Sequence, residues 1–285
     1  MDFSGIWIPL VTPFRGGAVD TAALAKLVRH CAAQGVAGFV PCGSTGEAAM
    51  LDPEEQQQVL ATTLDAAAGL PVIAGLAGAR PERVGERARA LAATLPLAGF
   101  LLTAPAYVKP SQAGIAEFFL KVAEISPLPL VAYDVPARTG VRIEVPTLLA
   151  LAEHPRIVAL KDCSSDRATA EAVLADGRLA LLAGNDDELF DQLARGAAGG
   201  ITASAHLATD RFVSLQRAFA ASDLDQARRL WRGLQPLVRA AFAEPNPAPL
   251  KAALAAEGRI ANELRAPMHP AAPATAQALA ALSRR

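Results

Sequence analysis

The chain has 285 residues, 52% of them hydrophobic, and a formal net charge of −1. This composition supports a large buried core and excludes an intrinsically disordered protein. The near-zero charge provides no basic field for nucleic acid or anionic lipid, and no apolar run reaches the roughly 18 residues of a membrane span.

The N-terminus and the cysteines predict a cytoplasmic protein. The first residues lack a basic segment and a long apolar segment, so no signal peptide is expected. Cys31, Cys42 and Cys163 are odd in number and show no CxxC spacing, which indicates reduced thiols. The four histidines are far apart in sequence, and no metal site is expected.

Apolar, strand-like runs recur along the chain, and each is followed by a helical pattern. The runs cover residues 5–11, 37–41, 71–76, 99–103, 128–133, 157–162, 179–183 and 199–203. Eight such units predict an α/β fold, a (β/α)8 TIM barrel with its helices outside. An open doubly wound sheet is the alternative, and the absence of a GxGxxG turn after the first run disfavours it.

Local signals place several helix starts. Asp20 and Asp52 are predicted N-caps, with Pro53 in the first turn and Glu55 at the capping-box position. One helix after the eighth strand completes a barrel, so we expect a catalytic domain over 1–221 and a C-terminal α-helical extension over 222–285. Within that extension, residues 223–242 are expected to form a long amphipathic helix.

In the sixth run, Ile157–Asp162, four apolar residues are followed by Lys161. A buried ammonium is costly unless it is paired or loses its charge. Lys161 is therefore either a lysine whose head reaches solvent at a strand end or a Schiff-base lysine that faces a pocket.

Polar residues follow several of the other runs. Catalytic groups of a parallel barrel lie at the C-terminal ends of its strands and in the loops after them. Ser44 and Thr45 follow the second run, Tyr107 follows the fourth and Tyr133 ends the fifth; these are the chain's two tyrosines. A neutral Lys161 attacks a carbonyl, and Tyr133, Thr45 or Ser44, and Tyr107 are suited to relay protons.

Two features suggest acidic substrates. Backbone N–H groups of the turn around Ser44 and Thr45 can bind a carboxylate. Arg138, in the loop after the fifth run, can grip a second carboxylate. These features predict a keto acid that is joined to, or cleaved from, another acidic molecule.

Each of these interpretations has a purely structural alternative. The Gly-Ser-Thr-Gly segment is also an ordinary turn, and Arg138 a solvated surface residue. Glu47 is more typical of a helix-start carboxylate than of a general base, and Asp186 and Asp187 are expected to cap a helix.

The chain resembles the dihydrodipicolinate synthase and N-acetylneuraminate lyase family of Schiff-base aldolases over nearly its whole length. The resemblance lies in the motifs GSTGE at 43–47, YDVPARTG at 133–140, LKD at 160–162, GNDD at 184–187 and EPNP at 244–247. It implies a (β/α)8 barrel with a helical extension, and a homotetramer built as a dimer of dimers.

The resemblance also implies roles for individual residues. Lys161 would form a covalent imine with pyruvate without a cofactor, Tyr133 would relay protons, and Thr45 would hold the pyruvate carboxylate. Ser44 keeps a hydroxyl for the relay, and Tyr107 would reach the neighbouring subunit's site. The backbone carbonyl of Ile201 would lie beside Lys161, and Gly184 would belong to the substrate site.

Arg138 and the segment 244–251 favour the synthase branch, in which the matching arginine holds the carboxylate of L-aspartate 4-semialdehyde. The expected function is therefore 4-hydroxy-tetrahydrodipicolinate synthase of lysine and diaminopimelate biosynthesis. The alternatives are another pyruvate-dependent lyase, a sugar-acid dehydratase of the same family, or a non-catalytic barrel. At the positions that bind inhibitory lysine in some members this chain has Gln56, Arg80, Val84 and Ala106, so weak or absent lysine inhibition is expected.

Overall fold

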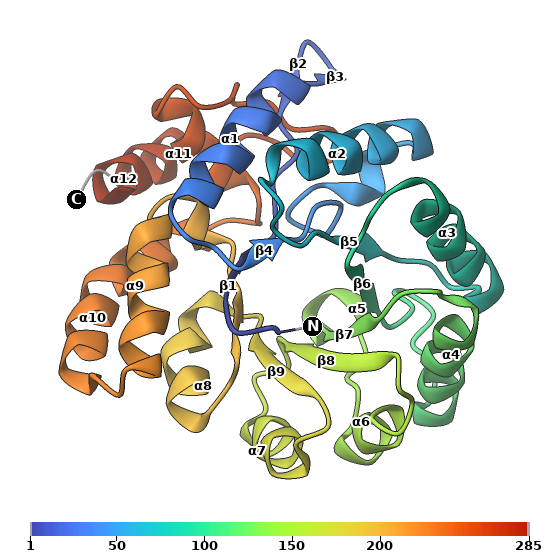
Figure 1. Cartoon of the computed structure of the whole chain (residues 1–285). Coiled ribbons are helices and arrows are strands. Elements are labelled where there is room, and N and C mark those ends of the chain that lie inside the picture. The colour runs from blue at the N-terminus through green and yellow to red at the C-terminus, as the bar shows by residue number, and fades with distance from the viewer. Residues whose placement is uncertain (1, 284–285) are drawn as a thin grey trace. The chain divides into compact units, whose positions relative to one another are not determined.

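The computed structural model describes residues 2–283, in which eight parallel strands alternate with helices (Figure 1). The strands are β1 (Gly5–Ile8), β4 (Gly38–Phe39), β5 (Ile73–Leu76), β6 (Gly99–Thr103), β7 (Leu130–Asp134), β8 (Ile157–Asp162), β9 (Ala180–Ala183) and β10 (Gly199–Ile201). They form one sheet in the order β4-β1-β10-β9-β8-β7-β6-β5. A bridge from Phe39 in β4 to Val72, just before β5, leaves the barrel nearly closed. The predicted (β/α)8 barrel is confirmed.

The expected strand runs fall where strands form. The runs at 99–103 and 157–162 coincide with β6 and β8. The strand expected over 5–11 is shorter in the structure, where β1 ends at Ile8. A hairpin of β2 (Phe14–Arg15) and β3 (Ala18–Val19) was not predicted. Strands of two residues are too short to show an alternating pattern.

Contacts group the described residues into two units. The first unit runs from Ile73 to Ile201, with the N-terminal segment through Ser4, and contains β5 to β10. The second unit holds Gly5–Val72 and the chain from Thr202 onward.

In the first unit, helices cover the outer side of the strands. The helices are α3 (Pro81–Thr94), α4 (Gln112–Ile125), α5 (Pro136–Thr139), α6 (Val145–Leu151), α7 (Arg167–Asp176) and α8 (Leu189–Arg195), with a 3-10 turn η2 (Asp186–Glu188). Helices α3, α4, α6 and α7 pack side by side in that order (Figure 1). All five residues of β7 are buried, as expected for a parallel strand that packs on both faces.

In the second unit, helices flank the other strands. They are α1 (Thr21–Ala33), α2 (Pro53–Ala66), α9 (Thr209–Ala220), α10 (Leu224–Ala241), α11 (Ala248–Ala256) and α12 (Pro273–Ser283), with 3-10 turns η1 (Ala48–Met50) and η3 (Ser204–His206). The predicted caps are confirmed. The side chain of Asp20 accepts from Ala23 N at 2.9 Å. Asp52 accepts from Glu55 N at 2.8 Å, while Glu55 accepts from Asp52 N at 3.1 Å.

The long amphipathic helix is confirmed as α10, with Asp223 as its N-cap and Phe242 as its C-cap. One face of α10 buries Trp231, Leu234 and Val238, spaced three and four residues apart. The division into a catalytic barrel over 1–221 and an extension over 222–285 stays a prediction.

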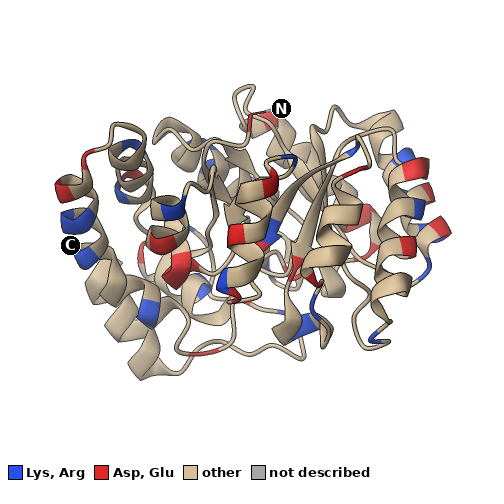
Figure 2. Ribbon diagram, turned by 90° about the horizontal axis from the view of Figure 1, so that it is seen from below, with Lys and Arg blue, Asp and Glu red and all other residues tan. Residues whose placement is uncertain are grey.

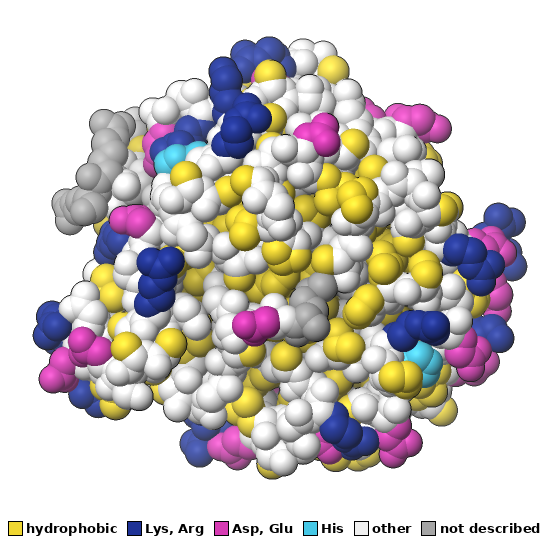
Figure 3. Space-filling view, viewed as in Figure 1, with side chains coloured by type: hydrophobic (Ala, Val, Ile, Leu, Met, Phe, Trp, Pro, Cys, Tyr) yellow, Lys and Arg dark blue, Asp and Glu magenta, His cyan; other side chains and the backbone are white. Residues whose placement is uncertain are grey.

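Acidic and basic residues are interspersed along the helices (Figure 2). On the face drawn in Figure 3 side chains of both signs of charge also occur around the edge. Among residues 2–283 no helix is both long and apolar enough to cross a membrane.

Candidate active site

Lys161 is a buried residue near the C-terminal end of β8, with only 6% of its surface exposed. Tyr133 of β7 lies opposite Lys161 in the strand register. The Lys161 Nζ atom lies 4.3 Å from the centroid of the Tyr133 ring. Because the head of Lys161 does not reach bulk solvent, the structure argues against the solvent-reaching alternative.

The surroundings of Lys161 favour its neutral form. Burial, the largest cause, lowers the pKa of the Lys161 ammonium. The positive charge of Arg138 acts in the same direction, whereas Cys163 and Asp186 raise the pKa. A lysine that loses its proton more readily is a better nucleophile toward a carbonyl.

Gly184 lets the chain after β9 approach Lys161 closely. A Cβ atom at Gly184 would lie 2.4 Å from Cys163 Sγ, 2.8 Å from the Asp162 carbonyl oxygen and 3.0 Å from Lys161 Cγ. The backbone N–H of Gly184 donates to that same Asp162 oxygen at 2.8 Å. Gly184 therefore lies against the aliphatic stem of Lys161, and a side chain at position 184 would displace the lysine.

The other expected site residues of the first unit differ in exposure. Arg138 is exposed on the four-residue helix α5, directly after β7. Ile201 ends β10, two strands from β8 in the sheet. Tyr107 has a positive φ of 69° and is 96% exposed, so within this unit its side chain projects into solvent.

In the second unit, Thr45 lies in the turn between β4 and η1. Its hydroxyl is buried and accepts a hydrogen bond from Asn246 Nδ2 at 2.9 Å. Gly46 next to it has no room for a Cβ, which would approach the Leu10 carbonyl oxygen to 2.8 Å. Ser44 is partly buried in the same turn. The sequence did not point to Asn246, although it lies in the EPNP motif.

Glu47 and Lys251 form a buried ion pair that the sequence analysis missed. Both side chains are fully buried, and Lys251 Nζ also donates to the Glu263 carbonyl oxygen at 2.9 Å. Arg265 N donates to the other carboxylate oxygen of Glu47 at 3.1 Å. This structure supports the structural role for Glu47 over a general base. A lysine inside the apolar run at 248–254 was the available signal.

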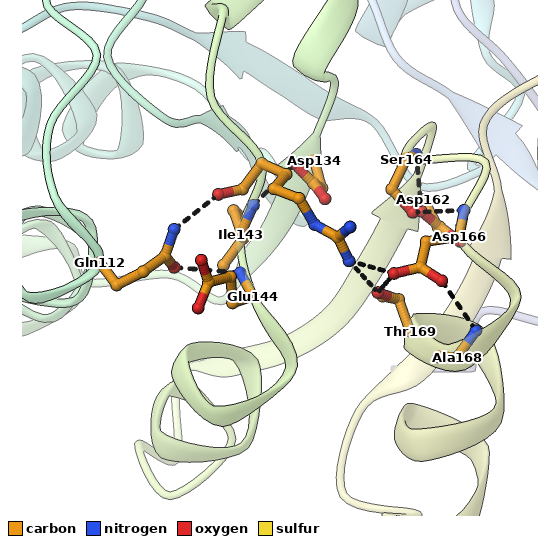
Figure 4. A network of polar contacts seen from close by, with 10 residues as sticks. Gln112, Asp134, Ile143, Glu144, Asp162, Ser164, Asp166, Ala168 and Thr169 are labelled. Atoms are coloured by element: carbon orange, nitrogen blue, oxygen red, sulfur yellow. Dashed lines mark hydrogen bonds and ion pairs between the residues drawn. The ribbon is translucent and has the colours of Figure 1, made fainter.

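Two further carboxyl groups belong to the same two strands, β7 and β8, as Tyr133 and Lys161, and both are labelled in Figure 4. Asp134 and Asp162 are register partners on β7 and β8, and both are buried. Each directly follows a predicted site residue in the sequence, so the strand pairing was the signal that sequence reasoning lacked.

One expectation about carboxylates was wrong. Asp186 does not cap a helix; it is buried within η2, whose N-cap is Asn185. The tight turn after β9 draws Asp186 inward, where its charge acts on Lys161. Within residues 2–283 no group of three or more His, Cys, Asp or Glu residues is placed to hold a metal ion.

A parallel (β/α)8 barrel with a buried lysine at a strand end, set against a tyrosine ring, defines the class of Schiff-base barrel enzymes. Residues 2–284 match the family model described as "Dihydrodipicolinate synthetase family". The chain belongs to this family.

Relatives and solved structures agree with the family model. The chain is 37% identical to 4-hydroxy-tetrahydrodipicolinate synthase 2 of Clostridium acetobutylicum, with 95% of this chain and 96% of that protein covered. It is 39% identical to the 4-hydroxy-tetrahydrodipicolinate synthase of Sorangium cellulosum, with 100% and 96% covered. The crystal structure of the Thermotoga maritima dihydrodipicolinate synthase superposes with a TM-score of 0.96 at 30% identity, covering 100% of this chain and 98% of that one.

Proposed function

We propose that the protein condenses pyruvate with L-aspartate 4-semialdehyde through an imine at Lys161, as a 4-hydroxy-tetrahydrodipicolinate synthase. The observation that carries this proposal is Lys161 Nζ, buried at the end of β8 and 4.3 Å from the Tyr133 ring centroid. Relatives that bear the synthase name, over nearly the full length of the chain, support the choice of reaction.

The pyruvate half of the reaction uses Lys161 and Tyr133. The neutral amine of Lys161 attacks the ketone carbon of pyruvate, and loss of water leaves the imine. Loss of a methyl proton then gives an enamine, a carbon nucleophile held on the enzyme. The Tyr133 hydroxyl is suited to carry the protons of these steps, with Thr45 holding the pyruvate carboxylate and Ser44 and Tyr107 continuing the relay.

The second half joins the enamine carbon to the aldehyde carbon of the second substrate. The amino group of that substrate then attacks the imine carbon, which closes the ring and releases the Lys161 amine. Arg138 would hold the carboxylate of the aldehyde substrate, because a guanidinium matches a carboxylate with two parallel hydrogen bonds. Its exposure on α5 leaves it free to do so. Gly184 and the carbonyl of Ile201 would complete the pocket, and no cofactor takes part.

A substrate panel with purified protein tests the reaction. We expect turnover of pyruvate with aspartate semialdehyde and none with N-acetylneuraminate or 2-keto-3-deoxy sugar acids. Loss of a charge-assisted hydrogen bond in Arg138→Ala should raise KM for the aldehyde on the order of 10–100-fold. Arg167→Ala, at an exposed ion pair on α7, is the control. Turnover of a sugar acid with no synthase activity contradicts the proposal.

Assembly and regulation extend the proposal. Tyr107 and Val108 are 96% and 60% exposed, and two adjacent exposed apolar side chains favour a subunit contact in a homotetramer, with Tyr107 entering a neighbouring site. We propose a cytoplasmic enzyme that lysine inhibits weakly or not at all. Val84 offers no carboxylate, and Ala106 offers no aromatic ring, for a bound lysine.

A further inference from the structure

Asp134 ties a loop to the end of β7. It follows Tyr133 directly, so the two side chains leave opposite faces of the strand. Asp134 Oδ1 accepts a hydrogen bond from the backbone N–H of Ile143, nine residues along the chain, at 3.1 Å. The residues between them include α5 and Arg138. This hydrogen bond closes the loop that carries Arg138.

Other contacts fasten the far end of the same loop (Figure 4). Gln112 of α4 donates to the Arg142 carbonyl oxygen at 2.9 Å and accepts from Glu144 N at 3.0 Å. The Arg142 guanidinium forms an ion pair with Asp166, the N-cap of α7. The Gln112 amide is neutral and the Arg142–Asp166 pair is partly exposed. Among the side chains that hold this loop, Asp134 is therefore the one that is both buried and titratable.

The second oxygen of Asp134 is in an unusual position. Asp134 Oδ2 is buried and makes no hydrogen bond within the described residues. Across the strand pair, Asp162 has hydrogen bonds to both oxygens, from Ser164 N at 2.8 Å and from Gln192 Nε2 at 3.3 Å. A buried, unpaired carboxylate oxygen next to another carboxyl group favours a protonated acid.

The charges around Asp134 act mostly in one direction. The pKa of Asp134 is raised to about 7; burial is the largest cause, and the negative charges of Asp162 on β8 and of Asp166, the N-cap of α7, act in the same direction. The hydrogen bond from Ile143 and the positive charge of Arg142 oppose the rise. On the other side of β7, Thr103 of β6 is the register partner of Tyr133. The next residue after Thr103 is Ala104, which carries no charge.

We propose that Asp134, as the neutral acid, is a positioning residue that holds the loop 135–143 and thereby sets Arg138 to receive the second substrate. This role rests on the proposed function, because the proposed function assigns to Arg138 the binding of the carboxylate of the aldehyde substrate. Asp134 itself faces away from Tyr133 and acts through the loop.

The role predicts a dependence on pH with a definite sign. The native carboxyl keeps its proton to a higher pH than the unfolded chain, whose Asp pKa is about 3.9. The stability that Asp134 contributes therefore falls as the pH rises from about 4 to about 7. Above that range the ionised Asp134 is buried, and its loss of hydration, with the repulsion from Asp162 added, favours opening of the loop. KM for the aldehyde should therefore rise on the alkaline side, while KM for pyruvate stays level.

Two substitutions separate the parts of this proposal. Asp134→Ala removes the acceptor for Ile143 N, and loss of one buried hydrogen bond should raise KM for the aldehyde about tenfold, with KM for pyruvate within about twofold. Asp134→Asn keeps the acceptor and resembles the neutral acid. It should keep a low KM for the aldehyde and abolish the rise between pH 6.5 and 8.5. Asp176→Ala, at the far end of α7, is the control.

The outcomes distinguish this role from the proposed function. Absence of wild-type turnover of the aldehyde contradicts the proposed function. With wild-type turnover present, an unchanged KM in Asp134→Ala, or an equal rise for both substrates, contradicts the positioning role. A wild-type pH profile in Asp134→Asn also contradicts the positioning role. If Asp134→Ala does not fold, the pH profile of Asp134→Asn alone tests that role. Borohydride trapping of pyruvate in both variants should remain at the wild-type rate.

Discussion

At the scale of single residues, two buried lysines have different partners. Burial lowers the pKa of both Lys161 and Lys251. The carboxylate of Glu47 opposes this lowering and pairs with Lys251, so Lys251 belongs to a structural ion pair. Both Nζ atoms lie over an aromatic ring, Lys251 at 4.2 Å from the Phe14 centroid and Lys161 at 4.3 Å from the Tyr133 centroid. Among the described residues Lys251 also pairs with a carboxylate and Lys161 does not, which leaves the Lys161 amine available for chemistry.

The Glu47–Lys251 pair should therefore matter for stability. Lys251→Met leaves the Glu47 carboxylate buried without its counter-charge, and we expect the free energy of unfolding to fall by about 3–5 kcal/mol. Urea denaturation measures this value. Replacing both partners, as Glu47→Leu with Lys251→Met, should recover most of the loss, because no charge then remains buried.

Lys121→Met provides the matched control, since Lys121 forms an exposed pair with Glu124 and should change the free energy of unfolding by less than about 1 kcal/mol. If Lys251→Met and Lys121→Met have equal effects, the buried pair is not a structural tie.

At the scale of elements, the sequence predicted what local signals specify. The capping box joins Asp52 and Glu55, three positions apart in the sequence, and its pattern identifies the start of α2. Lys161 at a strand end was visible because the apolar run stops there. The Glu47–Lys251 pair was not, since its partners are far apart in the sequence. Asp134 and Asp162 required the register between β7 and β8, which no local pattern provides.

The close approach of β8 to the turn after β9 also gives a test. Gly184→Ala places a methyl group against Cys163 Sγ and the stem of Lys161. A displaced amine should form the pyruvate imine on the order of 10–100-fold more slowly. Gly114→Ala in α4, where a Cβ meets only Pro110 Cβ at 3.3 Å and Ser111 Oγ at 3.6 Å, is the control. Equal trapping rates in the two variants would contradict the packing argument.

At the scale of the whole molecule, the βα alternation predicted the barrel because each unit needs a neighbour to bury its strand. The hairpin of β2 and β3 escaped prediction because distant residues hold it. The side chain of Glu263 accepts from Gly16 N and Gly17 N at 2.9 and 2.6 Å, and the Arg265 guanidinium donates to the Gly17 carbonyl oxygen at 2.7 Å.

The proposed assembly belongs to the same scale. Val108→Glu puts a charge beside the exposed Tyr107 and should shift the sedimentation coefficient toward smaller species, since a buried unpaired charge opposes association. Leu224→Glu, at another exposed apolar residue, should leave the sedimentation coefficient unchanged. A Val108→Glu protein that sediments like the wild type would place the subunit contact elsewhere.

The account depends most directly on an imine at Lys161. Incubation with pyruvate and borohydride, followed by peptide mass mapping, should show a reduced pyruvate adduct on the peptide that contains Lys161. Lys161→Ala should show no adduct and no synthase activity, whereas Lys121→Ala should behave as the wild type. An adduct on another lysine, or full activity in Lys161→Ala, would contradict the account.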